Sequence, residues 1–130
     1  MPTIFTRIIQ GQIPCEKIFE NDRWIAFLDI RPVVTGHALL VPKLEVDYLF
    51  DLPDDLLSEM LLTARPVAAA IQKVVPCARI GLMVVGVDVP HVHLHLMPIN
   101  GGGEMDFKNA RPADPAALRD LGTRIRAALT

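Results

Sequence analysis

The segment 90–98 constrains this chain more than any other part of it, because it alternates histidine with apolar residues in the run PHVHLHLMP. Successive side chains of a β-strand point to opposite faces of a sheet, so His91, His93 and His95 would share one face. The other face would carry the apolar residues between them, Val92, Leu94 and Leu96. We therefore expect a strand with one buried apolar face and one outward-facing row of three imidazoles.

A solvated polar face and a metal site are the two alternatives to a catalytic row. Histidine at every outward position, with a fourth, His37, after a Thr35-Gly36 turn, is poorly explained by solubility. Three imidazoles suit zinc, but His91 and His95 would start about 13 Å apart on a strand, too far to share one ion easily. We predict no metal, and a row of imidazoles that titrate near neutrality and act as nucleophile, hydrogen-bond donor and proton carrier.

The rest of the chain predicts an α+β fold. Apolar spacing indicates a short helix over 4–9 and a long amphipathic helix over 53–75. Asp114 and Pro115 would begin a C-terminal helix as its N-cap and first residue. Short apolar runs between turns predict five strands, over 17–20, 24–29, 36–41, 79–85 and 92–97. A mainly antiparallel five-stranded sheet in a single domain over 1–130 follows, with 99–114 expected to be a mobile loop because it is rich in glycine and aperiodic.

The composition argues against a long nucleic acid or a membrane as a partner and favours a second copy of the chain. The formal charge of −2 gives no cationic field to attract a long nucleic acid. Hydrophobic residues make up 51% of the chain, which favours a homodimer that covers part of the apolar surface. The start of the sequence lacks a signal-peptide pattern, no apolar run reaches membrane-spanning length, and Cys15 and Cys77 form no pair motif. We expect a cytoplasmic protein without membrane contact.

The histidine run resembles the pattern His-φ-His-φ-His-φ-φ, where φ is apolar, of the histidine triad (HIT) nucleotide-binding proteins. The segments IFTRIIQGQIPCEKIFENDRWIAFLDIRP and GHALLVPK are similar to the amino-terminal half of that family, so that the resemblance covers about residues 3–98. It is strongest to the Hint-like branch. The resemblance implies a HIT-like fold, a purine nucleotide as substrate and no cofactor.

The resemblance also implies roles for the histidines. His93 would attack the α-phosphorus of a nucleoside phosphoramidate or a related conjugate and form a nucleotidyl-histidine intermediate, which water hydrolyses to a nucleoside monophosphate. His95 would donate a hydrogen bond to a phosphoryl oxygen, while His37 and His91 would orient the row and relay protons. One imidazole can serve both steps because it is nucleophilic when neutral and a good leaving group once protonated.

The nucleoside contacts follow from the same resemblance. Asp29 would accept hydrogen bonds from the ribose hydroxyls, although an aspartate before Arg31-Pro32 also fits a turn. The purine would lie between apolar side chains, for which core packing is an equally good explanation in the case of the two phenylalanines. These are Phe19, Phe27 and Ile30.

Two departures from the family pattern bear on function. Asp88 stands where a hydroxyl residue is usual, and a carboxylate there would repel a substrate phosphate unless it points away. Some bacterial members bind a structural zinc, but Thr3, Thr6 and Glu45 stand at three of those positions, so we expect none here. The first departure leaves alternatives to the hydrolase: a non-catalytic nucleotide sensor, a nucleotidyltransferase or a dinucleoside polyphosphate hydrolase.

Overall fold

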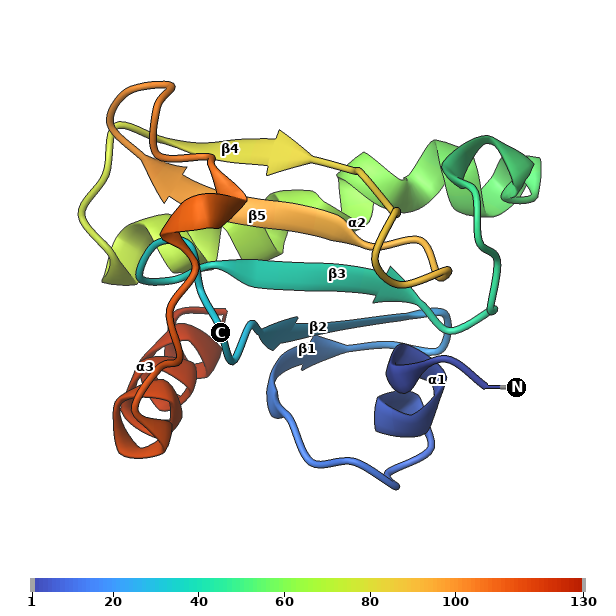
Figure 1. The fold of residues 1–130 in the computed structure, drawn as a ribbon, viewed down its shortest axis with the longest axis horizontal. Helices are drawn as coiled ribbons and strands as arrows, with labels where there is room; N and C mark the ends of the chain where they lie inside the picture. The colour runs from blue at the N-terminus through green and yellow to red at the C-terminus, as the bar shows by residue number, and fades with distance from the viewer. Residues whose placement is uncertain (1, 130) are drawn as a thin grey trace.

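The computed structural model describes residues 2–129, and its centre is an antiparallel five-stranded sheet with the strand order β1-β2-β3-β5-β4 (Figure 1). The strands are β1 (Glu16–Glu20), β2 (Trp24–Leu28), β3 (Ala38–Pro42), β4 (Arg79–Met83) and β5 (Leu94–Ile99). The helices are α1 (Ile4–Ile9), α2 (Asp54–Val74) and α3 (Pro115–Ala128), with short 3-10 turns η1 (Leu49–Asp51) and η2 (Phe107–Asn109). The α+β fold expected from the sequence is confirmed.

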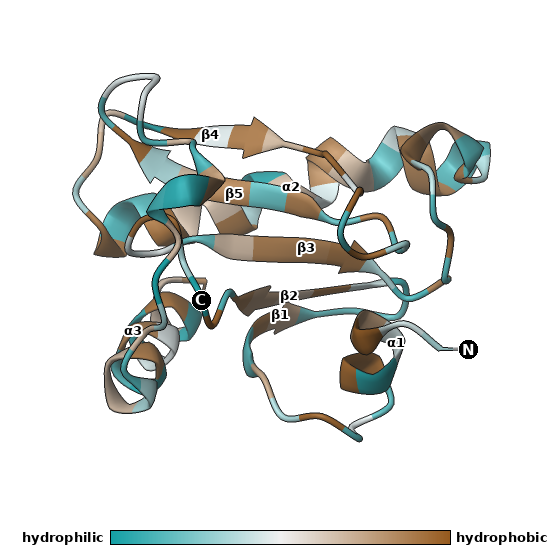
Figure 2. Ribbon diagram, in the orientation of Figure 1, coloured by the Kyte–Doolittle hydropathy of each residue, from teal (hydrophilic) through white to brown (hydrophobic). Residues whose placement is uncertain are grey.

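Both faces of the sheet are covered, which explains why every residue of β2 and β3 is buried. On one face, α2 and α3 pack over alternate strand residues such as Ala26, Leu40 and Leu96. On the opposite face, which we call the α1 face, α1 contributes Phe5 to a smaller apolar cluster with Ile25, Phe27, Leu39 and Val41. Figure 2 shows hydrophobic colour along β3 and hydrophilic colour on η2. The two faces of the sheet thus have separate apolar clusters.

The helix limits agree closely with the sequence. α1 spans the predicted residues 4–9. α2 begins one residue later and ends one residue earlier than the predicted range 53–75. α3 begins at Pro115, and Asp114 caps it by accepting a hydrogen bond from the Ala116 amide at 3.4 Å. Within residues 2–129, none of the helices has the length and hydropathy that a membrane span requires.

The last strand differs from its prediction at both ends. β5 begins at Leu94, so His91 and His93 lie in a segment before it, and it continues through Pro98 to Ile99. Proline is tolerated there because the pairing with β3 stops at Ala38↔Leu96, whereas the pairing with β4 continues to Ile99. The apolar face is as predicted, since Val92, Leu94 and Leu96 are all buried in the helix-covered core.

The segment 99–114 is more structured than a plain loop. It contains η2, and Met105 packs over Gly81 of β4, where a side-chain Cβ would come within 2.5 Å of the Met105 sulfur. Near its end the segment is hydrogen-bonded to the turn that follows β2. The amides of Arg111 and Ala113 donate to the carbonyls of Pro32 and Ile30 at 3.2 and 2.9 Å. The expectation of an exposed segment holds for most of these residues, and these contacts hold the segment against the sheet. Its mobility stays a prediction.

Candidate functional site

The fold brings all four histidines to one place on the α1 face of the sheet. His95 lies on β5 and pairs with Leu39, while His37 immediately precedes β3. Gly36 makes this entry possible with a φ of 90°, which favours glycine. The ring centroid of His95 lies 4.9 Å from that of His93 and 5.1 Å from that of His37. The grouping predicted from alternation is therefore observed.

The histidines are buried, which corrects the expectation of an outward-facing row and also excludes the solvated polar face. Their exposed fractions are 1% for His37, 0% for His91 and 6% for both His93 and His95. The physical reason is the second layer on this face: the Phe5 ring of α1 packs edge-on against His91 and His93, and the Phe107 ring of η2 packs against His95. Periodicity identifies the face, but not what covers it.

Hydrogen bonding fixes the tautomer of His93. Its Nδ1 lies 2.7 Å from the carbonyl oxygen of His91, and a carbonyl can only accept, so Nδ1 carries the proton. In the neutral ring, Nε2 then holds an unshared electron pair. His93 is thereby oriented as a nucleophile or base through Nε2.

His37 fixes the tautomer of His95 in the same way. The amide of Val33 donates to His37 Nδ1 at 3.0 Å, so the proton of neutral His37 is on Nε2. That nitrogen lies 2.9 Å from Nδ1 of His95 and donates to it. The proton of His95 is consequently on Nε2, which makes His95 a hydrogen-bond donor beside the electron pair of His93.

His91 is held from both sides of its ring. Its Nε2 donates to the Pro42 carbonyl at 2.8 Å, and its Nδ1 accepts from the Thr3 hydroxyl at 2.8 Å. The carboxylate of Glu45 in turn accepts from the Thr3 amide at 2.9 Å and from the Thr6 hydroxyl at 2.6 Å. The amino-terminal end of α1 is thus linked through His91 to the carbonyl that orients His93.

Burial favours the neutral form of His37, His91 and His95. Desolvation is the main cause that lowers the pKa of His95 to about 3, with the neighbouring His37 and His93 adding to it. Desolvation also lowers the pKa values of His37 and His91 below the usual 6.5, against the opposing effects of Asp29 on His37 and of the Pro42 carbonyl and Glu45 on His91. The expectation that all these imidazoles titrate near neutrality is therefore wrong, since a charged ring has no water to solvate it here.

Three side chains come close enough to resemble a metal site: Asp29, His37 and His95, whose potential ligand atoms lie within 4.8 Å of one another. The hydrogen bonds argue against a metal. Because Val33 donates to Nδ1 of His37, Nε2 of the neutral ring carries a proton and has no electron pair for an ion. The 2.9 Å contact between His37 and His95 is a hydrogen bond, so this cluster does not fit a metal.

The sequence predicts that no zinc is bound at Thr3, Thr6 and Glu45. In the structure, hydrogen bonds join these three side chains to one another and, through Thr3, to His91. Structural zinc is held by thiolates, imidazoles and carboxylates, and two of these four side chains are alcohols. The donor set therefore does not fit a structural zinc.

Asp29 uses its two carboxylate oxygens differently. Oδ1 accepts from the Arg31 amide at 2.9 Å, which is the turn role suggested by the sequence. Oδ2 lies 3.7 Å from Nε2 of His37 and faces the histidines. Asp29 can therefore hold the turn with one oxygen and contact a substrate with the other.

The apolar side chains near the site differ from the predicted set. Phe27 lies on the α1 face with its ring 5.7 Å from that of Phe5, and Ile30, just after β2, is 67% exposed. Phe19 does not belong here, which corrects its prediction. It pairs with Ala26 after a bulge in β1 and packs against the core on the opposite face.

Phe5, which is not among the site residues predicted from the sequence, contacts Phe27 on the α1 face, and the sequence carries a signal for it. The residues Ile4, Phe5, Ile8 and Ile9 recur at helical spacing in α1, which indicates that one side of this short helix must be covered. Which sheet face receives that side is a tertiary contact that the spacing does not specify.

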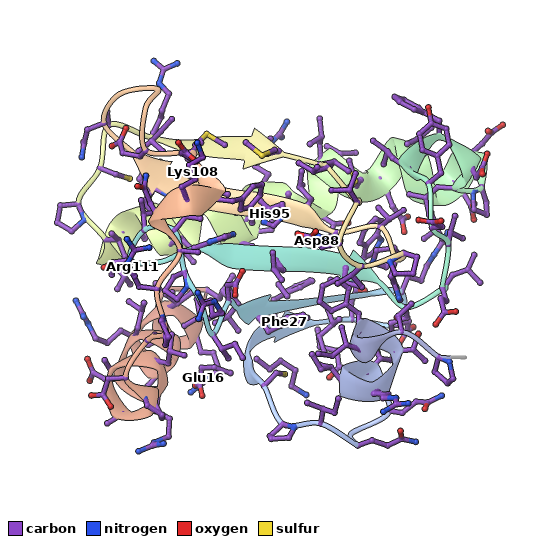
Figure 3. All side chains as sticks on the ribbon, in the orientation of Figure 1. Glu16, Phe27, Asp88, His95, Lys108 and Arg111 are labelled. Atoms are coloured by element: carbon purple, nitrogen blue, oxygen red, sulfur yellow. The ribbon has the colours of Figure 1, made fainter. Side chains whose placement is uncertain are left out.

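A pocket opens beside His93 and His95. Its volume is about 80 Å³, and it is lined by Val85, Gly86, Val87, Asp88, His93, His95 and Phe107. Figure 3 shows Asp88 and His95 on the viewer's side of the sheet. A larger cavity of about 270 Å³ lies between the turn 32–37 and α3, but neither His93 nor His95 lines it. The small pocket is therefore the one next to the reactive atoms.

The chain matches the HIT domain model over residues 10–101. Among curated proteins, it is 36% identical over 100 residues to "Adenosine 5'-monophosphoramidase HNT1" of Saccharomyces cerevisiae, which covers 73% of this chain and 61% of that protein. It is 31% identical to "Adenylylsulfatase HINT3" of Arabidopsis thaliana, over 73% of this chain and 51% of that protein.

The structural comparison extends over almost the whole chain. A crystal structure of a Hit-like protein from Bartonella henselae matches with a TM-score of 0.85 at 29% sequence identity. The match covers 97% of this chain and 95% of that one. The sheet, the helices and the segment after β5 are therefore all part of the shared fold.

The neutral, buried rings predict that acid weakens the fold. For a histidine whose pKa is lower when folded, the unfolded chain binds more protons below 6.5, so that the free energy of unfolding falls as pH drops below 6.5. Between about pH 7.5 and 5.5 we expect His95 to lower the free energy of unfolding by about 1 kcal/mol and His37 and His91 to lower it further, measured by urea denaturation. His95→Gln should reduce this loss. A constant stability over the range would contradict the neutral state of the buried rings.

The Thr3 hydroxyl should stabilise the fold through His91 and also as the N-cap of α1, where it accepts from the Thr6 amide at 3.1 Å. Thr3→Val leaves Nδ1 of a fully buried imidazole without its donor, which should reduce the free energy of unfolding by about 1–3 kcal/mol. Thr63→Val on α2 is the matched control, since it makes the same change in a half-buried threonine away from the histidines. Equal effects of the two substitutions in denaturation would show that the hydrogen bond contributes nothing.

Proposed function

The chain belongs to the HIT-domain family, and from that premise we propose that it is a hydrolase that cleaves nucleoside phosphoramidates or related conjugates of the nucleotide α-phosphate. The main support is that the two neighbouring rings offer different groups at Nε2. His93 holds an unshared electron pair there, and His95 carries an N–H donor. A nucleophile next to a donor for the phosphoryl oxygen is what displacement at phosphorus requires.

In the first step, His93 Nε2 attacks the α-phosphorus and forms a P–N bond. The bond to the leaving group breaks, its electron pair goes to the leaving nitrogen, and that nitrogen takes a proton from water. The imidazole of His93 becomes cationic, and its Nδ1–H bond to the His91 carbonyl stabilises that charge. His95 Nε2–H donates to a phosphoryl oxygen as negative charge develops there.

In the second step, water attacks the same phosphorus. The bond from phosphorus to His93 breaks with its electron pair returning to Nε2, and a proton is released with the nucleoside monophosphate. His37 supports both steps, because its Nε2–H bond to His95 keeps the donor of His95 directed at the phosphate. The imidazoles supply both the nucleophile and the donor that these steps require.

The nucleoside would lie on the side of the histidines toward β2. Asp29 Oδ2, the oxygen not used by the turn, would accept from the ribose hydroxyls. A purine would cover the exposed side chain of Ile30, which follows the strand of Phe27. Covering an exposed isoleucine with a flat aromatic base removes apolar surface from water, which is favourable.

We also propose that the protein is a homodimer joined through β4. The sheet has two edge strands, and the outer edge of β1 is occupied, because the Arg126 guanidinium of α3 donates to the Lys17 carbonyl at 2.6 Å. β4 is the other edge, and Leu82 on it is 46% exposed. An edge strand with apolar side chains invites pairing with a second copy, which also fits the hydrophobic composition.

The cysteines favour a reducing compartment. Cys15 and Cys77 are both free and half-buried. Because unpaired cysteines are typical of proteins that work where thiols stay reduced, we place the proposed activity in the cytoplasm.

Replacing His93 tests the reaction. His93→Ala should lower the release of AMP from adenosine 5′-phosphoramidate by at least about 10³-fold, because the substitution removes the nucleophile. Circular dichroism and AMP binding by calorimetry verify that the variant is folded. In the wild type, a quenched reaction should yield a label on His93 that is labile in acid and stable in base. AMP binding without turnover by the wild type would favour a sensor instead.

Light scattering tests the dimer. The wild type should have twice the chain mass of 14.3 kDa, and Leu82→Lys should give the monomer because it places a charge on the pairing strand. Leu44→Lys is the matched control, since Leu44 is 49% exposed but lies outside the strands. A monomeric wild type, or a Leu82→Lys dimer, would contradict the proposed interface.

A further inference from the structure

The small pocket beside His93 and His95 has one apolar wall and one acidic residue. Val85, Val87 and Phe107 supply apolar side chains, and Asp88 supplies a carboxylate. Among the described residues that line the pocket, Asp88 is the only acidic one, and none is a lysine or an arginine. At about 80 Å³ the pocket is smaller than the sites that hold whole cofactors, so it suits part of a substrate.

The wall formed by Phe107 is held in place by its neighbours. The ring lies 5.1 Å from that of His95, and the segment before it is closed by the Glu104 carboxylate, which accepts from the amides of Asn100 and Gly101 at 2.6 and 2.8 Å. Met105 packs against β4. The pocket is therefore bounded on one side by the Phe107 ring, which packs against His95.

The position of this pocket matches that of the leaving group. Asp29, the proposed ribose contact, lies at the end of β2 and does not line this pocket, whereas the loop 84–90 between β4 and β5 supplies four of its seven lining residues. If the ribose lies at Asp29 and the phosphorus at His93, the third part of the substrate lies between Asp88 and Phe107. That part is the group that leaves.

We propose that Asp88 selects the leaving group by charge, so that the protein prefers amines over anionic leaving groups such as sulfate or phosphate. This inference rests on the proposed function. The phosphoramidate nitrogen takes a proton from water before the P–N bond breaks, so it carries a positive charge that a nearby carboxylate stabilises, and it then leaves as a neutral amine with the electron pair of the broken bond. A departing sulfate accumulates negative charge and is repelled by the same carboxylate.

Nearby cations do not neutralise this effect within the pocket. The Arg111 guanidinium is turned to its own segment, where it donates to the carbonyls of Lys108 and Ala110 at 2.9 and 2.8 Å. Lys108 lies on η2, and it does not line the pocket. The two functions named for the relatives, phosphoramidase and adenylylsulfatase, differ in leaving-group charge, and Asp88 favours the first.

The test compares two substrates that share the adenylyl half. AMP release from adenosine 5′-phosphoramidate and from adenosine 5′-phosphosulfate is measured with the wild type, Asp88→Asn and Asp22→Asn. Asp22 is an exposed carboxylate in the turn between β1 and β2, so its variant controls for the change in net charge. The readout is the ratio of the two kcat/KM values, which a loss of folded protein does not alter.

We expect the wild type to prefer the phosphoramidate, and Asp88→Asn to move the ratio about tenfold toward the phosphosulfate, an effect that salt should weaken. Asp22→Asn should not move the ratio. Hydrolysis of both substrates with a ratio that Asp88→Asn leaves unchanged, or a wild type that prefers the phosphosulfate, would overturn this inference alone. No hydrolysis of either substrate by the wild type would overturn the proposed function as well, and the inference with it.

Discussion

The structure of the site depends on the hydrogen bonds that the fold gives to the buried imidazole rings. A buried ring is held by the polar groups that meet its nitrogens, and whether such a group accepts or donates decides which nitrogen carries the proton. The Pro42 and His91 carbonyls accept, while the Val33 amide donates. Each of these partners is a backbone group of fixed polarity, so each tautomer is set by the fold and not by pH.

This constraint divides the work among four identical side chains. His93 and His95 both have a partner at Nδ1, but the partner of His93 accepts a hydrogen bond and the partner of His95 donates one, so His93 presents an electron pair at Nε2 and His95 a proton. Burial strengthens the division, because it lowers the pKa of His95 and so keeps the ring neutral. A solvated row of histidines would exchange protons and lose these separate roles.

The second layer on the α1 face has a double function. Phe5 from α1 and Phe107 from η2 exclude water from the imidazoles, and both come from segments that contribute no strand to the sheet. The same two segments border the parts of the site where base and leaving group would bind. Thr3 and Glu45 connect α1 to His91, so that the covering of the site and the orientation of the nucleophile depend on one set of hydrogen bonds.

Local sequence was enough to predict the strand alternation, the main helices and the four histidines of the site, since period and capping are properties of neighbouring residues. It was not enough to predict that Phe5 rather than Phe19 meets Phe27, because a bulge in β1 turns Phe19 to the other face. The burial of the histidines and the partners of Nδ1 in His37 and His91 also required the folded chain. The contact between Thr3 and His91 spans 88 residues and depends on how α1 packs against the sheet, which no local pattern encodes.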